Sequence, residues 1–280
     1  MRQIRLIILA LVLLGTLVFL DTRLSCIHAR GTGIEWAILD QEVMELQRAG
    51  KYDRAVLVAQ KALQVAEQNV GSNHPDVARG LSNLIVIYNN LGDYAKAEPL
   101  LKRALAIREK ALGPDHPDVA SSLDNLANLY RTLGDYAKAE PLLKRSLAIK
   151  EKAPDRYHLN VTTSMDNLAA LYEIQDDYAK AELLYKHSLA IREKALGTDH
   201  YNVALSLNNL ADLYRNQSDY AKAEPLYKRS LAISEKALGP DHPDVATSLE
   251  ILAFLYRATK RVSEAEALEQ RAAKIRAIKR

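Results

Sequence analysis

A 42-residue segment repeats along most of this chain, and the repeat restricts the possible folds more than any other feature of the sequence. The copy at residues 218–259 matches the copy at 92–133 at 32 of 42 positions. Equivalent positions of successive copies hold Tyr52, Tyr94, Tyr136, Tyr178, Tyr220 and Val262, without a gap in the register. A fixed period of this length is typical of stacked arrays in which each unit packs on its neighbours.

Each copy contains two helical patterns. In the stretch 117–132 the apolar positions follow a spacing of 4, 3, 1 and 3, which fits one face of a helix and not a strand. The stretch 136–151 has the same periodicity, with lysine and arginine on its opposite side. We therefore predict an all-α solenoid of antiparallel helix pairs over residues 34–280, with six pairs at 34–70, 75–112, 117–153, 159–196, 201–238 and 243–279.

Two sets of polar residues recur where helices are expected to begin. An aspartate precedes the second helix of four copies and can accept hydrogen bonds from its free backbone N–H groups: Asp93, Asp135, Asp177 and Asp219. A histidine recurs in the longer loop: His74, His116, His158, His200 and His242. Successive copies about 10 Å apart cannot share one metal ion, whose ligands lie about 2 Å from it. We interpret the histidines as loop caps and predict no metal or other cofactor.

The N-terminal segment at 1–20 differs from the repeats. Arg2 and Arg5 precede an uncharged apolar run at 6–20, which predicts a signal peptide or membrane anchor. The run spans roughly 22 Å as a helix, less than the roughly 30 Å hydrocarbon core of a bilayer. No clear cleavage site follows, so removal, membrane contact through residues 4–20 and lipidation at Cys26 stay open. Residues 21–33 show no periodic pattern and predict a linker.

Arginines before the apolar run favour an orientation that places the repeats outside the cytoplasm, membrane-anchored or exported. A cytoplasmic location is the alternative. Residues 31–280 carry 34 basic and 34 acidic side chains, since residues 1–30 hold four arginines and one aspartate of the totals of 38 and 35. This balance does not support nucleic-acid binding. A single cysteine excludes an intrachain disulfide. No catalytic motif is present, so we expect that the protein is not an enzyme and has no small-molecule substrate.

The turn sequence GDYAKAE and the preceding NLANLY resemble the tetratricopeptide repeat. The 42-residue period and the segment ALAIREKALGPDHPDVA resemble the longer variant found in kinesin light chains and many bacterial proteins. The resemblance covers residues 35–275. It implies a right-handed superhelix whose first helices line a concave groove, and a non-catalytic role in binding peptides or proteins.

An asparagine recurs at one position of four successive first helices: Asn83, Asn125, Asn167 and Asn209. An amide donates and accepts hydrogen bonds, so it can pair with the backbone of an extended peptide of any sequence. The alternative is that these asparagines bond only within the array. The resemblance to kinesin light chains implies that they line the groove. Steps of three and four positions place further candidate groove residues on the same face: Asn128, Arg131, Asp166, Asp212 and Arg215.

These observations favour a protein-interaction scaffold that binds an extended peptide or protein segment in its groove. The alternative is a membrane-tethered structural or assembly subunit that uses its convex helix faces and leaves the groove empty. The basic residues of the second helices, such as Lys102 and Arg108, alternate with glutamates and are interpreted as a solvated convex face.

Overall fold

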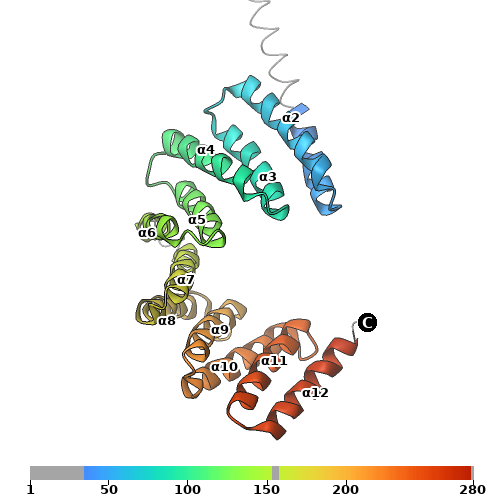
Figure 1. Ribbon diagram of the computed structural model, residues 1–280, viewed down its shortest axis with the longest axis vertical. Helices are drawn as coiled ribbons and strands as arrows, with labels where there is room; N and C mark the ends of the chain where they lie inside the picture. Colours follow the sequence, from blue (N-terminus) through green and yellow to red (C-terminus); the bar gives the residue numbers. More distant parts are fainter. Residues whose placement is uncertain (1–34, 153–157, 279–280) are drawn as a thin grey trace, which may run out of the picture. The chain divides into compact units, whose positions relative to one another are not determined.

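The computed structural model describes residues 35–152 and 158–278, where every regular element is a helix (Figure 1). The predicted signal peptide or anchor at 1–20 and the linker at 21–33 lie outside the described residues. Within the described ranges, no helix is both long and apolar enough to cross a membrane. The chain divides into two compact units, residues 1–122 and 123–280.

The first unit contains consecutive helices that pack on one another. A helix over residues 35–48 comes first, and α2 packs on α3 and α3 on α4. The bounds are α2 (Tyr52–Val70), α3 (Pro75–Asn90), α4 (Tyr94–Leu112) and α5 (Pro117–Thr132), and the second unit begins within α5.

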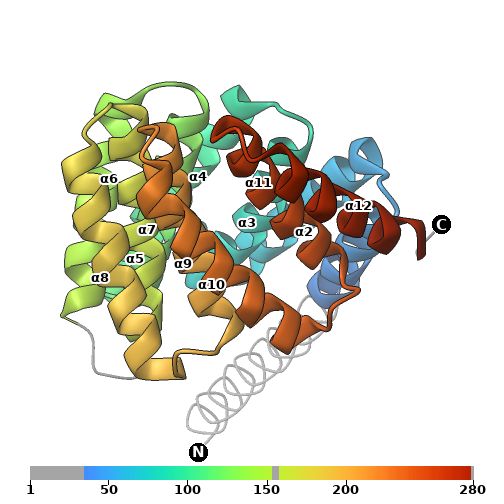
Figure 2. The same cartoon turned by 90° about the horizontal axis from the view of Figure 1, so that it is seen from below.

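The second unit continues the same pattern. From α6 to α12 each helix packs on the next, and Figure 2 shows α9 and α10 side by side. The bounds are α6 (Tyr136–Glu151), α7 (His158–Ile174), α8 (Tyr178–Leu196), α9 (Tyr201–Asn216), α10 (Tyr220–Leu238), α11 (Pro243–Ala258) and α12 (Val262–Ile278). The prediction of an all-α repeat fold is confirmed. We call α3, α5, α7, α9 and α11 first helices, and the even-numbered helices second helices.

Small residues at one recurrent position let the helices approach closely. All of them are fully buried, at 0% exposure: Ala55, Ala97, Ala139, Ala181, Ala223 and Ala265. A larger side chain at such a position would have to displace neighbouring core groups, because protein interiors are close-packed. Larger apolar side chains such as Leu207 and Leu249 are also fully buried and fill the space around these contacts.

The predicted caps form at both kinds of helix start. The aspartates accept a hydrogen bond at 3.3 Å from the backbone N–H of the third residue after them: Lys96, Lys138, Lys180 and Lys222. Histidine Nδ1 accepts at 3.1–3.2 Å from the backbone N–H two residues later, in His74, His116, His200 and His242. The interpretation of the histidines as caps is confirmed for these four, and the side chain of His158 lies outside the described atoms.

Candidate functional site

The four recurrent asparagines, which we call the asparagine ladder, occupy α3, α5, α7 and α9. Asn125 is exposed, and Asn83, Asn167 and Asn209 are half-buried. The last three rungs lie in the second unit, whose first helices are neighbours. Ser164 of α7 donates to Asp124 of α5, and Asn216 of α9 donates to Glu173 of α7. Asn125, Asn167 and Asn209 therefore stand on three successive, adjacent helices.

Asn83 differs from the other rungs because its amide is already bound. Its Nδ2 donates to Asp40 Oδ1 at 2.5 Å, in the helix over residues 35–48. Its backbone carbonyl also accepts from Gln47 at 3.4 Å. The amide of Asn83 therefore bonds within the repeat array, as the alternative prediction stated.

Asn125, Asn167 and Asn209 have side-chain amides that bond to nothing in residues 35–152 and 158–278. Each amide keeps two N–H donors and a carbonyl acceptor available. Polar groups that are not satisfied by the protein must be satisfied by water or by a ligand. The three rungs of the second unit can therefore pair with an external backbone.

The sequence predicts Asp166 on the same face as the ladder, and the structure places it against the next helix. Its Oδ2 forms an ion pair with Arg192 of α8 at 2.7 Å, and the two side chains are only 15% and 13% exposed. Its Oδ1 is buried without a partner among the described residues. Burial raises the pKa of Asp166 above its ordinary value, and the nearby Ser188 hydroxyl and Arg192 guanidinium oppose that shift.

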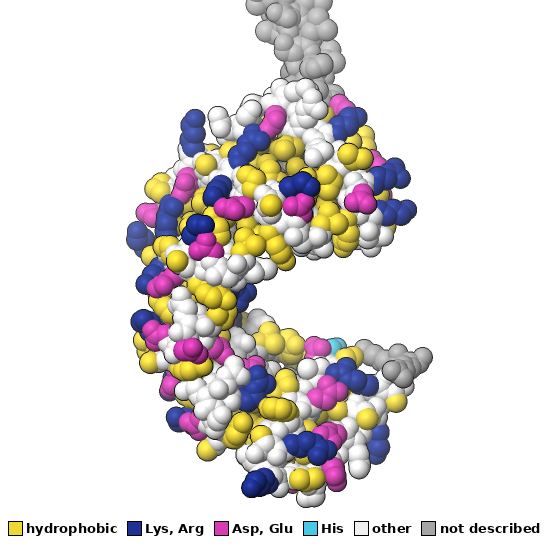
Figure 3. Space-filling view, viewed as in Figure 1, with side chains coloured by type: hydrophobic (Ala, Val, Ile, Leu, Met, Phe, Trp, Pro, Cys, Tyr) yellow, Lys and Arg dark blue, Asp and Glu magenta, His cyan; other side chains and the backbone are white. Residues whose placement is uncertain are grey.

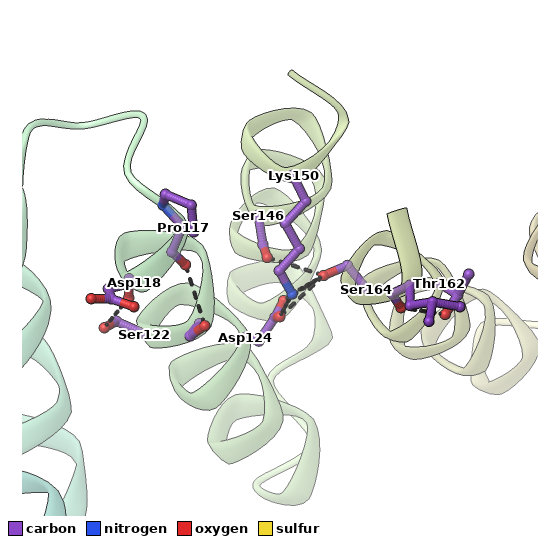
Figure 4. Close-up of polar contacts among 10 residues, drawn as sticks. Pro117, Asp118, Ser122, Asp124, Ser146, Lys150, Thr162 and Ser164 are labelled. Carbon is purple, nitrogen blue, oxygen red and sulfur yellow. Dashed lines mark hydrogen bonds and ion pairs between the residues drawn. The ribbon is translucent and has the colours of Figure 1, made fainter. Parts of the chain in front are cut away.

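The same arrangement recurs in neighbouring copies. Lys150 Nζ lies 2.5 Å from Asp124 Oδ2 and 2.7 Å from Ser164 Oγ, inside the second unit (Figure 4). Arg276 donates to both carboxylate oxygens of Glu250 at 2.8 Å. In every case the acid lies on a first helix and the base on the second helix that follows it. We did not predict this pairing, although comparing the two positions across the copies would have suggested it.

The first unit contains the neutral counterpart of these ion pairs. Arg108 donates to Ser122 Oγ at 2.6 Å and to Ser82 Oγ at 3.3 Å. Its interpretation as part of a solvated convex face is therefore wrong, because the position faces neighbouring helices. Burial lowers the pKa of the Arg108 guanidinium, and the charge of Asp118 opposes that shift. Lys102, at a different position of the same helix, is exposed as expected.

Asp212 and Arg215, also predicted for this face, bind each other. Arg215 Nη2 lies 2.9 Å from Asp212 Oδ1, which also accepts a hydrogen bond at 2.6 Å from the hydroxyl of Tyr227. The hydroxyl of Tyr185 donates to Glu173 at 3.3 Å in the preceding copy. Burial, followed by the nearby carboxylates, raises the pKa of both tyrosines, so they stay protonated donors near neutral pH.

The remaining two predicted residues lie on α5. Asn128 and Arg131 are half-buried. The guanidinium of Arg131 forms no ion pair or hydrogen bond with a described residue. It is therefore a charged group of the first-helix face that a ligand can reach without competing for an existing ion pair.

Charged side chains of the second helices are joined from copy to copy. An arginine lies 2.5–2.6 Å from a glutamate of the preceding second helix in three pairs: Arg103 with Glu67, Arg229 with Glu193, and Arg271 with Glu235. Basic and acidic side chains alternate over the face shown in Figure 3. Within the described part of the chain, no group of three or more His, Cys, Asp or Glu side chains could hold a metal ion.

Comparisons with known proteins all point to one family. Models of the tetratricopeptide repeat match residues 43–76, 76–152, 125–194, 160–236 and 202–277. The crystal structure of BtubC (BKLC) from P. vanneervenii is 26% identical with a TM-score of 0.66, covering 86% of this chain and 91% of that one. A Podosopora anserina putative kinesin light chain with nearly identical repeats is 29% identical with a TM-score of 0.64, covering 74% of this chain and 98% of that one.

More distant structures share the fold alone. PilW, a type IV pilus biogenesis factor, is 19% identical with a TM-score of 0.59, covering 86% of this chain and 92% of that one. No curated protein sequence matches this chain.

Proposed function

Because this chain belongs to the tetratricopeptide repeat family and is similar to its kinesin-light-chain-like members, we propose that it binds an extended peptide or protein segment along its first helices. The family's fold is a general scaffold for protein-protein interaction and is typically non-catalytic. The proposal adds a particular surface and a particular mode of recognition to that general role.

One observation carries the proposal. Asn125, Asn167 and Asn209 present side-chain amides that have no partner among the described residues, on three adjacent helices, whereas the amide of Asn83 is bound to Asp40. If neighbouring first helices lie about 10 Å apart, each step spans about three residues of extended chain. Three rungs would then hold a segment of about seven residues through its backbone.

The charges beside the ladder limit the chemistry of the ligand. Asp124, Asp166 and Asp212 are each paired with a base of the same unit. A bound segment would have to break these pairs to use them. Breaking either of the first two is costly because their side chains are at most 15% exposed, whereas Asp212 and Arg215 are more exposed. The proposal therefore excludes a ligand recognised mainly by high charge, and a short, nearly neutral segment fits better.

A pulldown after proximity crosslinking, from the native cell, tests the proposal. The full chain is compared with the variant Asn125→Ala/Asn167→Ala/Asn209→Ala, and Asn83→Ala serves as the matched control. We expect the triple variant to lose a partner that the wild type and Asn83→Ala both retain, with circular dichroism unchanged. Retention of every partner by the triple variant would leave the groove idle and favour the alternative, an assembly subunit that uses its convex faces.

We also propose that the N-terminal apolar run at residues 6–20 exports or anchors the chain, with the repeats outside the cytoplasm. The run of uncharged residues after Arg2 and Arg5 supports this. Separation of cells into membrane, soluble and extracytoplasmic fractions tests it. Recovery of the full-length chain in the cytoplasmic fraction alone would contradict the proposal.

A further inference from the structure

Two nearly identical copies differ on one stripe of the first helix. Along the sixteen residues of α5 and α11, the two helices differ at five positions and agree at the other eleven. The five differences fall at positions 121, 124, 125, 128 and 132 of α5, a spacing of 3, 1, 3 and 4 that follows a single helix face. We call these positions and their equivalents in the other copies the variable stripe.

The first helix α9 varies at the same stripe. Between α5 and α9, apart from the two residues at the helix start, every difference lies on it, at positions 205, 208, 212 and 216 of α9. Packing holds most of the remaining positions of α5, α9 and α11 constant, because most of these side chains fill a close-packed core. The stripe also contains the asparagine ladder. A face that varies while the scaffold beside it does not is free to take on the chemistry of a ligand.

The stripe changes in character at α11. The ladder position there holds Ile251, and the position three residues later holds Phe254, where α5 has Asn128 and α9 has Asp212. Phe254 is 58% exposed, and Ile251 is half-buried. Tyr201 of α9 donates to Asp244 of α11 at 3.1 Å, so α11 adjoins the helix that carries the last free rung. The asparagine ladder therefore ends where an apolar surface begins.

The charged neighbours of this apolar surface are neutralised within the chain. Glu250 accepts two hydrogen bonds from Arg276, and Arg257 donates two at 2.6 Å to Glu269. The charges of these neighbouring positions are therefore already balanced and do not favour an ionic ligand group. The surface that remains exposed is aromatic and aliphatic, so it complements an uncharged apolar side chain.

We propose that Ile251 and Phe254 form a specificity subsite that takes a bulky apolar side chain of the same extended segment whose backbone is bound by Asn125, Asn167 and Asn209. This inference rests on the proposed function and names the kind of ligand. The segment continues past the last asparagine rung and places one large aliphatic or aromatic residue against α11. Burying Phe254 against such a residue supplies the hydrophobic part of the affinity.

The test uses a display library of random dodecapeptides, selected on the full chain and on the variant Ile251→Asn/Phe254→Asn. The variant places at α11 the residues that α5 carries at the same two positions, so the scaffold accommodates them. Leu183→Ala removes a leucine that is 70% exposed on the second helix α8 and serves as the control. The Asn125→Ala/Asn167→Ala/Asn209→Ala variant is selected in parallel.

We expect peptides enriched by the wild type and by Leu183→Ala to share a bulky apolar residue at one fixed position. The double variant should still enrich peptides but lose that preference, and should bind a wild-type peptide at least about tenfold more weakly. Enrichment without a shared apolar residue, or a preference that the double variant keeps, would overturn the subsite while leaving groove binding intact. If neither the wild type nor the double variant enriches a peptide, or if the triple variant binds as well as the wild type, groove binding fails and the subsite fails with it.

Discussion

At the scale of single residues, the first-helix face contains both satisfied and unsatisfied polar groups. Asp166 is only 15% exposed and forms an ion pair with Arg192, whereas the side chain of Asn167, the next residue in the chain, has no partner among the described residues. The adjacent positions therefore have different roles. One holds two helices together, and the other is available to a ligand.

The ion pair between Asp166 and Arg192 should affect the free energy of unfolding mainly because removal of either member leaves the other charge unpaired. The equivalent positions of the next copy hold Asn208 and Ser234, so the array already contains a neutral version of the pair. We predict that Arg192→Ser lowers the free energy of unfolding by about 3 kcal/mol, because it leaves a buried carboxylate unpaired. Adding Asp166→Asn should restore stability to within about 1 kcal/mol of wild type.

Urea-induced unfolding followed by circular dichroism measures both effects. The wild type, the two single variants and the double variant form a double-mutant cycle that isolates the pairwise contribution. A double variant as unstable as Arg192→Ser would show that the ion pair itself, and not the unpaired charge, dominates the stability at this position.

At the scale of helices, the chain was largely predictable from its repeat. The period predicted the helix pairs, and recurrent aspartates and histidines predicted the caps, because both signals are local and are repeated several times. Burial of Asp166 and Asp124 was not predictable from one helix alone. Helical spacing places both aspartates on the same face as the ladder. Whether their carboxylates are exposed to solvent or packed between helices depends on a base that another helix supplies. The bond between Asn83 and Asp40 depends in the same way on a helix of the preceding copy.

The aspartate caps predict how stability depends on pH. The pKa values of Asp93, Asp135, Asp177 and Asp219 lie below the ordinary value of 3.8, mainly because the lysine three residues later hydrogen-bonds to each carboxylate. A carboxylate whose pKa is lower in the folded state stabilises the fold at pH values above its pKa in the unfolded chain. This stability is lost as pH falls through its pKa in the folded state. We predict an unfolding temperature that changes little from pH 7 to pH 5 and falls below about pH 4.

Asp166 acts in the opposite direction, because its raised pKa in the folded state makes the fold lose stability as pH rises above 3.8. One such residue opposes four caps, so acid should destabilise the protein on balance. Differential scanning calorimetry between pH 2.5 and 7 measures the dependence. A variant with all four cap aspartates changed to asparagine should keep its caps, since asparagine also accepts the hydrogen bond, and should show a shallower fall below pH 4. An equally steep fall would assign the acid sensitivity to other groups.

At the scale of the whole molecule, the chain combines a nearly constant scaffold with a face that changes from copy to copy. The scaffold is maintained by buried alanines, helix caps and ion pairs that join successive copies. The variable stripe contains three asparagines whose amides bond to no described residue, and it becomes apolar at Ile251 and Phe254. This separation of scaffold from ligand-facing positions allows a repeat protein to keep its fold while its ligand specificity changes.

The most direct measurement of groove binding is site-specific photocrosslinking in the native cell. A photoreactive amino acid replaces Thr163, an exposed residue of the variable stripe on α7, or Leu183, an exposed residue of the second helix α8. We predict a covalent adduct with one protein partner from position 163 and none from position 183. Adducts from position 183 alone would contradict the account and would place the binding surface on the second helices.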